Sequence, residues 1–107
     1  MKLILAIVHN DDAYTVNTKL SESGFFATKI SSTGGFLMSG NSTFLIGVGD
    51  ERVEECIELI GRFCQRRVQS MPDNLIRHHH GAAPSPAQVT VGGATIFVLN
   101  VESFRQV

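Results

Sequence analysis

The residues best suited to binding chemistry lie in one glycine-rich stretch, residues 32–41, which reads STGGFLMSGN. Its adjacent glycines, Gly34 and Gly35, can turn successive backbone N–H groups toward one point, an arrangement that holds an anion such as phosphate. Phe36 offers a ring on which a flat heterocycle can stack, and Asn41 offers the paired donor and acceptor that suit an adenine edge. The same residues also suit an ordinary hairpin turn with Phe36 in the core. Spacing alone leaves both interpretations open.

Two further residues lie near this stretch if the strands on either side of it pair with each other. Thr28 precedes it and Gly47 follows it. A glycine inside a strand often marks the close approach of a ligand or of another backbone. Gly47 is therefore a candidate contact for a ligand, with a bulge or tight helix–strand packing as the alternative. Taken alone, Thr28 is an ordinary strand residue.

Three consecutive histidines, His78, His79 and His80, raise the question of a metal site. Consecutive residues on an extended chain point in alternating directions, and no cysteine or carboxylate stands at a ligand spacing from them. We expect a solvated loop here and no metal cofactor. A metal-binding trimer is kept as a minor alternative.

Catalysis has no positive support in the sequence. The hydroxyl groups of Ser31, Ser32 and Thr33 have no histidine or carboxylate predictably beside them. An acylphosphatase-type enzyme, which shares the fold type predicted below, requires an arginine in its phosphate loop, and none lies between residues 25 and 48. We therefore predict a protein that is not an enzyme.

The composition predicts one globular domain. The chain has 107 residues, of which 43% are hydrophobic and 18% charged, and its net charge of −1 argues against a general binder of nucleic acid polymers or membrane surfaces. The first residues, MKLILAIVHNDD, have too short an apolar run for a signal peptide, and no run is long enough to cross a membrane. Cys56 and Cys64 lie roughly 12 Å apart along one predicted helix, which is too far for a disulfide bond. Both are expected to be reduced, as in a cytoplasmic protein.

The hydrophobic pattern predicts five strands and two helices. The strands are residues 3–8, 25–32, 42–48, 88–91 and 94–101. The first helix begins with Asp11 or Asp12 as its N-cap and ends at Gly24, and the second begins at Asp50. Residues 68–87 contain all three prolines and are expected to form a long loop. The Gly92-Gly93 pair predicts that the last two strands form a hairpin.

This order, β-α-β-β-α-β with a final hairpin, predicts an α+β ferredoxin-like fold with two helices on one face of an antiparallel sheet. The first strand carries Ile4, Ala6 and Val8 on one face, and residues 3, 5 and 7 are apolar on the other. Because two helices cover only one face, the other face must be buried by something else. Another copy of the chain is the simplest candidate, so we expect an oligomer.

Two long stretches, ATKISSTGGFLMSGNSTFLIGV and VTVGGATIFVLNVESFRQ, resemble the PII-like cyclic di-AMP receptors of Gram-positive and related bacteria. The resemblance extends to the start, MKLILAIV, and to the second helix, so residues 1–107 are expected to form a single PII-like domain. It implies a homotrimer with ligand sites in the clefts between neighbouring subunits. The implied ligand, cyclic di-AMP, contains two adenosines joined by two phosphates.

The resemblance assigns ten residues to the ligand site. They are Thr28, Gly34, Gly35, Phe36, Leu37, Asn41, Gly47, Phe97, Leu99 and Gln106. In the implied arrangement the threonine and the asparagine hydrogen-bond an adenine, and the glycine of the third strand lets the base approach the backbone. The glycine pair holds its loop near the phosphates, and the two residues after it form a wall of the pocket. The residues of the last strand and the tail close the pocket from the adjoining subunit or from below.

The implied function is that of a cytoplasmic, non-enzymatic signalling protein. Ligand binding is expected to order the 33–41 and 68–87 loops and so change which protein partner docks. Phe26 stands where members of the family often carry arginine, so one basic group that would face the ligand is replaced. This replacement supports an alternative, a PII-like regulator that senses ATP or another adenine nucleotide.

Overall fold

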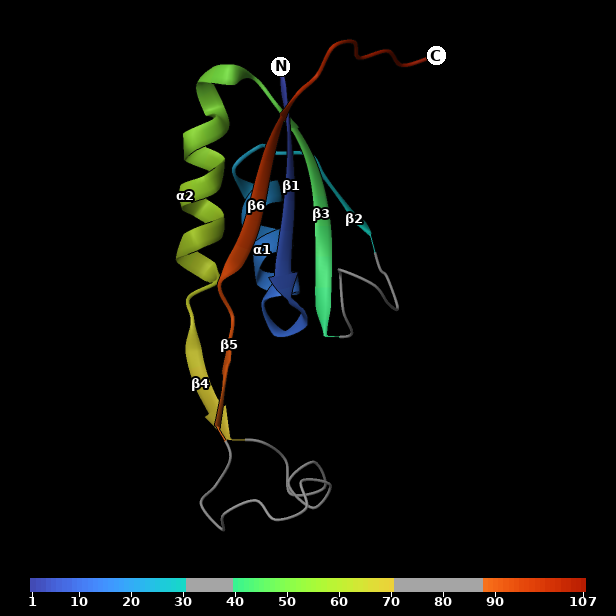
Figure 1. Cartoon of the computed structure of the whole chain (residues 1–107). Coiled ribbons are helices and arrows are strands. Elements are labelled where there is room, and N and C mark those ends of the chain that lie inside the picture. Colours follow the sequence, from blue (N-terminus) through green and yellow to red (C-terminus); the bar gives the residue numbers. More distant parts are fainter. Residues whose placement is uncertain (31–39, 71–87) are drawn as a thin grey trace.

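The computed structural model describes residues 1–30, 40–70 and 88–107 (Figure 1). Its elements in chain order are β1 (Lys2–His9), α1 (Asn10–Glu22), β2 (Ala27–Ile30), β3 (Asn41–Val48), the 3₁₀ turn η2 (Asp50–Arg52), α2 (Val53–Phe63), β4 (Arg67–Ser70), β5 (Gln88–Val91) and β6 (Ala94–Asn100). In the part of the chain that these ranges cover, no helix is long and apolar enough to cross a membrane.

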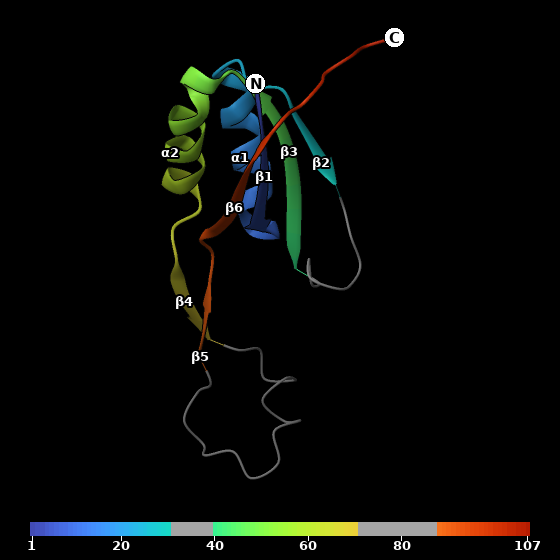
Figure 2. The same cartoon turned by 45° about the horizontal axis from the view of Figure 1, so that its top comes forward.

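The main sheet has four strands in the order β2-β3-β1-β6, and every neighbouring pair is antiparallel. Both helices lie on the same side of this sheet (Figure 2). The α+β class with an antiparallel sheet and two helices is therefore confirmed, and the strand order is compatible with a ferredoxin-like fold.

The core lies between the helices and one face of the sheet. Because strand side chains alternate, the even-numbered residues of β1 point to the helices, and Ile4, Ala6 and Val8 are buried there. On β3 the same face carries Phe44 and Ile46, both fully buried. The helices complete the core with Ala13, Val16, Leu20, Cys56, Ile60 and Cys64.

The first helix begins differently from the sequence-based expectation. Its N-cap is His9, whose Nδ1 accepts a hydrogen bond of 3.1 Å from the Asp11 backbone N–H, rather than Asp11 or Asp12. Imidazole is not among the preferred capping groups, so composition pointed to the aspartates. Asp11 and Asp12 instead occupy the first turn, where their negative charge suits the helix dipole.

Cys56 lies on the buried face of α2, and Cys64 is the residue at the helix C-terminus. Both are free cysteines, as predicted, and both are fully buried in the core. Burial raises the pKa of each thiol to about 11, since the apolar surroundings disfavour the thiolate. Both side chains are therefore protonated packing residues at neutral pH.

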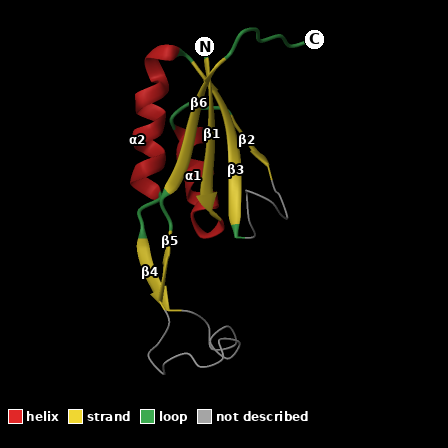
Figure 3. Cartoon of the chain, in the orientation of Figure 1, coloured by secondary structure: helices red, strands yellow, loops and turns green. Residues whose placement is uncertain are grey.

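The predicted hairpin of the last two strands is wrong. β5 pairs antiparallel with β4, whereas β6 pairs with β1, so Gly92 and Gly93 join two different sheets (Figure 3). Both glycines have positive φ, +88° and +76°, the conformation that a tight hairpin turn also uses. The glycine pair does form a tight bend, as its sequence indicates. Which strands pair on either side of the bend depends on β1 and β4, which lie far away in the sequence.

The predicted loop of residues 68–87 is also wrong at its start, because residues 68–70 belong to β4. Together β4 and β5 form a two-stranded ribbon that extends away from the main sheet beyond the end of α2 (Figure 1). Its base is linked to α1 by an ion pair of 3.3 Å between Arg67 Nη1 and Asp12 Oδ2. This ion pair fixes the position of the start of β4 relative to α1.

Candidate functional site

The face of the main sheet opposite the helices is apolar. The register places Leu5 beside Leu45 and Phe97, and Leu3 beside Gly47 and Leu99. Directly paired residues in an antiparallel sheet point to the same face. Phe97 and Leu99 are each 46% exposed, a large fraction for apolar side chains. The face that two helices leave uncovered is thus present, as the sequence predicted.

A cavity of about 780 Å³ lies on this face, where β2 and β3 meet the C-terminal tail. We call it the apolar cavity. Its lining residues are Met1, Leu3, Phe26, Thr28, Leu45, Gly47, Val101, Phe104 and Gln106. This volume is in the range of pockets that hold small organic ligands.

The chemistry of the apolar cavity suits a flat, uncharged group with a polar edge. Thr28 offers a hydroxyl and Gln106 an amide, while Phe26 and Phe104 offer aromatic rings. None of the lining residues in the described part of the chain has a charged side chain. Phe26 is 88% exposed, so its ring is available to a ligand or to another protein chain.

Gly47 provides access to the strand backbone in the apolar cavity. It lies opposite Leu3 in β1, and its φ is not positive, so the fold does not require glycine for conformation. A Cβ added here would meet only the Met1 Cε at 3.7 Å, an ordinary contact distance. The absence of a side chain therefore leaves open space rather than relieving a clash.

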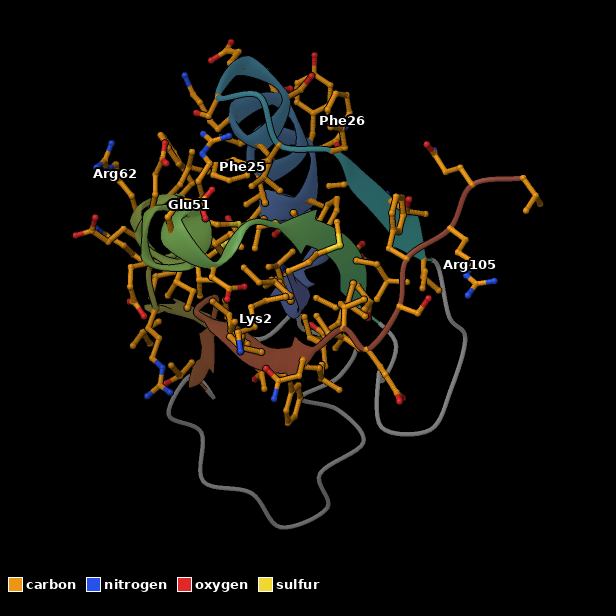
Figure 4. The ribbon with its side chains drawn as sticks, turned by 90° about the horizontal axis from the view of Figure 1, so that it is seen from above. Lys2, Phe25, Phe26, Glu51, Arg62 and Arg105 are labelled. Atoms are coloured by element: carbon orange, nitrogen blue, oxygen red, sulfur yellow. The ribbon has the colours of Figure 1, made fainter. Side chains whose placement is uncertain are left out.

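The C-terminal tail reaches the apolar cavity by crossing the end of the sheet. The Val101 N–H donates a hydrogen bond of 3.3 Å to the Met1 carbonyl oxygen, which extends the β1–β6 pairing by one step. Beyond it the tail extends toward the β2 side of the sheet, where Figure 4 labels Arg105. This path brings Phe104 and Gln106 to the cavity.

A second, smaller cavity of about 230 Å³ lies at the opposite end of the sheet. We call it the polar cavity. Its lining residues are Ile7, His9, Asn41, Arg66, Thr90, Gly92, Gly93, Ala94 and Thr95. Asn41 and Gly47 are six residues apart on β3, which is roughly 20 Å in a strand. Within one copy, Asn41 therefore does not reach the apolar cavity.

The full chain matches a protein-family model described as cyclic-di-AMP receptor, over residues 1–107. The chain belongs to the cyclic-di-AMP receptor family. It is also similar to a crystal structure described as that of a functionally unknown protein from Pediococcus pentosaceus ATCC 25745. The two chains are 40% identical and superpose with a TM-score of 0.74, and the match covers 99% of this chain and 96% of the other.

The predicted site of this cyclic-di-AMP receptor family member falls into separate places in a single copy. Thr28, Gly47 and Gln106 line the apolar cavity together. Asn41 lines the polar cavity. Phe97 and Leu99 lie on the same face of the sheet, but on β6, which β1 and β3 separate from β2. Four of the predicted site residues lie outside the described residues: Gly34, Gly35, Phe36 and Leu37.

Several cavity residues were not among the predicted site residues. The resemblance marks Phe26 only as a departure from the family pattern, and Phe104 lies in the C-terminal tail, beyond the last predicted strand. Arg66 follows the end of α2 and carries no motif. The available signal is an aromatic residue two positions before Thr28, because strand alternation places residues 26 and 28 on the same side.

The described residues, 1–30, 40–70 and 88–107, contain no group of three or more histidine, cysteine or carboxylate side chains that could hold a metal ion. The histidines at positions 78 to 80 lie outside these ranges. The prediction that they form no metal site stays a prediction.

Proposed function

We propose that this chain is a non-enzymatic signalling receptor that binds cyclic di-AMP between the subunits of a homotrimer. The observation that carries the proposal is the apolar cavity, in which Thr28, the open backbone at Gly47 and Gln106 meet on the helix-free face. These are polar groups at the edge of an apolar space, which suits a purine base. Membership of the cyclic-di-AMP receptor family over all 107 residues supports this choice of ligand.

The proposed adenine contacts divide between two places, and this favours a site between copies. Thr28 and Gly47 lie in the apolar cavity, whereas Asn41 lies at the other end of β3. All three nevertheless point to the same helix-free face. A neighbouring copy packed on this face would bring its own Asn41, Phe97 or Leu99 toward the first copy's apolar cavity.

A trimer would also bury the exposed apolar surface of the face. A cyclic assembly joins two different patches of the chain, so the β2 edge of one copy can meet the β6 edge of the next. The expected mass is three times the 11.7 kDa of one chain. Light scattering on a sizing column measures it directly, and a monomer at all concentrations would remove the proposed site.

The proposal includes a relay of ligand binding to a protein partner. Two segments are expected to order on binding, 33–41 and 68–87. The first ends at Asn41, the start of β3, and the second begins within β4. Residues 33–39 and 71–87 of these segments lie outside the described part of the chain. Ordering of a segment by a bound ligand is a common way to change a docking surface. The partner itself is not identified by these residues.

A second candidate, a sensor of ATP or another single adenine nucleotide, is favoured by one observation. Phe26 provides an uncharged ring at a position where the family resemblance implies arginine, and no described lining residue of the apolar cavity has a cationic side chain. A thermal-shift panel with cyclic di-AMP, ATP, AMP and cyclic di-GMP separates the candidates. The proposal predicts a saturable rise in melting temperature with cyclic di-AMP and a smaller or no rise with the others. A rise with ATP alone would favour the second candidate.

A further inference from the structure

The polar cavity is built from hydrogen-bond donors that converge from four elements or their junctions. Arg66 comes from the turn after α2, His9 from the end of β1, Thr95 from β6, and Gly93 from the bend between β5 and β6. Of the described residues that line it, none is a carboxylate, and Arg66 carries a permanent positive charge. We propose that this cavity is an anion site for a phosphoryl group, with Arg66 as its charged ligand.

The Arg66 side chain packs against the backbone of Gly93, where a larger residue would leave it less room. A Cβ on Gly93 would lie 3.0 Å from the Arg66 Cγ and 3.3 Å from its Nε, so the arginine side chain lies directly against the glycine backbone. The φ of Gly93 is +76°, which also favours glycine. The bend that redirects the chain into β6 therefore makes room for the guanidinium group.

The Arg66 charge is available to a ligand. Within residues 1–30, 40–70 and 88–107, the adjacent cation has a partner, since Arg67 pairs with Asp12 at 3.3 Å. Arg66 has no such ion pair among these residues. Since the Arg67 pair occupies Asp12, that carboxylate does not compete for Arg66.

His9 contributes a second donor through its tautomer. Its Nδ1 accepts the Asp11 backbone N–H at 3.1 Å, so the neutral ring carries its proton on Nε2. The Asp11 carboxylate is the acidic group beside this ring, 3.5 Å from the same Nδ1, and its side chain is largely exposed. The helix cap thereby fixes a histidine whose Nε2–H can donate to an oxyanion.

The size and the donor set indicate a small oxyanion. About 230 Å³ accommodates a phosphoryl group but is below the usual range of pockets for drug-sized ligands. An arginine with added N–H and hydroxyl donors forms short, charge-assisted hydrogen bonds with phosphate oxygens. Two sources share this chemistry: a phosphodiester of a nucleotide held partly by a neighbouring copy, and free inorganic phosphate.

The test is an NMR titration of the full chain in its native assembly with sodium phosphate, and separately with cyclic di-AMP, against sodium chloride at matched ionic strength. We expect saturable shifts at the amides of Gly92, Gly93 and Thr95. Arg66→Gln should weaken this binding by about tenfold or more, because the charged donor is lost. Arg62→Gln is the matched control, since Arg62 is an exposed arginine of α2 that does not line the cavity, and its binding should equal that of the wild type.

The outcomes separate the anion source and the two proposals. Arg66-dependent shifts with cyclic di-AMP assign the anion to the nucleotide, and Arg66-dependent shifts with phosphate alone assign it to a free anion. Shifts with neither, or shifts that Arg66→Gln and Arg62→Gln change equally, overturn the anion site. If wild type and Arg66→Gln bind cyclic di-AMP equally and neither binds phosphate, the anion site is overturned. The proposed function then still stands. Arg66-dependent phosphate binding without any cyclic di-AMP binding supports the anion site and overturns the proposed function.

Discussion

Gly92 and Gln65 lie in backbone contact, so close that a Cβ on Gly92 would overlap the Gln65 carbonyl oxygen. The same Cβ would lie 2.8 Å from Arg67 Nη1. This contact joins the segment that leaves α2 to the segment that enters β6. It fixes the base of the β4–β5 ribbon and, with it, one wall of the polar cavity.

Gly92→Ala should lower the free energy of unfolding by about 1–3 kcal/mol. Two costs add: the φ of +88° strains any residue with a side chain, and the new methyl group meets backbone atoms that cannot move aside easily. Urea unfolding followed by circular dichroism measures the change.

Gly61→Ala is the matched control for this substitution. Gly61 lies inside α2, and a Cβ there would meet nothing within 4 Å, so alanine should raise the stability by up to about 1 kcal/mol. If both variants had the stability of the wild type, the contact between Gly92 and Gln65 would not constrain the fold.

Gly47→Val should prevent ligand binding without unfolding the chain. The valine side chain would occupy the apolar cavity, while its β-branched shape suits the strand and the only nearby atom is Met1 Cε at 3.7 Å. We expect cyclic di-AMP affinity to fall at least tenfold and the melting temperature to stay within about 3 °C, the shift that a small stability change produces. Unchanged affinity would place the ligand elsewhere.

Asn41→Ala should weaken cyclic di-AMP binding by about 1–3 kcal/mol, because a buried polar edge of the base would lose its hydrogen-bond partner. The separation of Asn41 from Gly47 in one copy makes a sharper test possible. If the two residues act from different copies, mixing and reassembling Asn41→Ala chains with Gly47→Val chains restores some intact sites.

This mixing experiment has a defined negative result. Each variant alone should show little binding, and calorimetry on the mixed trimers should recover a fraction of the wild-type sites. No recovery, with mixed assembly verified by mass spectrometry, would assign both residues to one copy's site. It would then exclude the arrangement in which Asn41 and Gly47 act from different copies.

The buried thiols should make stability fall at alkaline pH. Burial raises the pKa of Cys56 and Cys64 from 9.0 to about 11. As the pH rises through about 9, the unfolded chain releases thiol protons that the folded chain still holds, so the unfolded state becomes relatively more stable. This contribution to stability is complete below pH 9 and is lost toward pH 11. Urea unfolding at pH 8 and pH 10 measures it, and a Cys56→Ala, Cys64→Ala variant should show a smaller decrease between the two pH values.

Much of the fold could be predicted because its signals are local. Alternation in β1 separated Ile4 from Leu3, and the helical pattern placed Cys56 in a helix, where it is buried. The Gly92-Gly93 pair predicts a hairpin that does not form, since positive φ at both residues suits a hairpin turn and a bend between two sheets equally well. Only the pairing partners distinguish these cases, and they lie far away in the sequence.

The site could be predicted in part. Thr28 and Gly47 share one cavity because β2 and β3 pair, as expected, but the expectation that Gly47 lies near residues 32–41 is wrong, since Gly47 stands at the other end of β3. Phe104 reaches that cavity only because the tail crosses the sheet end, a path that no residue pattern encodes. Arg66 and His9 meet because a helix end, a strand end and a glycine bend converge, which depends on tertiary packing.

The most direct measurement of the central claim is a calorimetric titration of the purified assembly with cyclic di-AMP. The proposed function predicts saturable binding near one ligand per chain, which Gly47→Val removes. Heat that matches the dilution blank across the titration, with the assembly intact, would contradict the claim that copies of this chain form a cyclic di-AMP site.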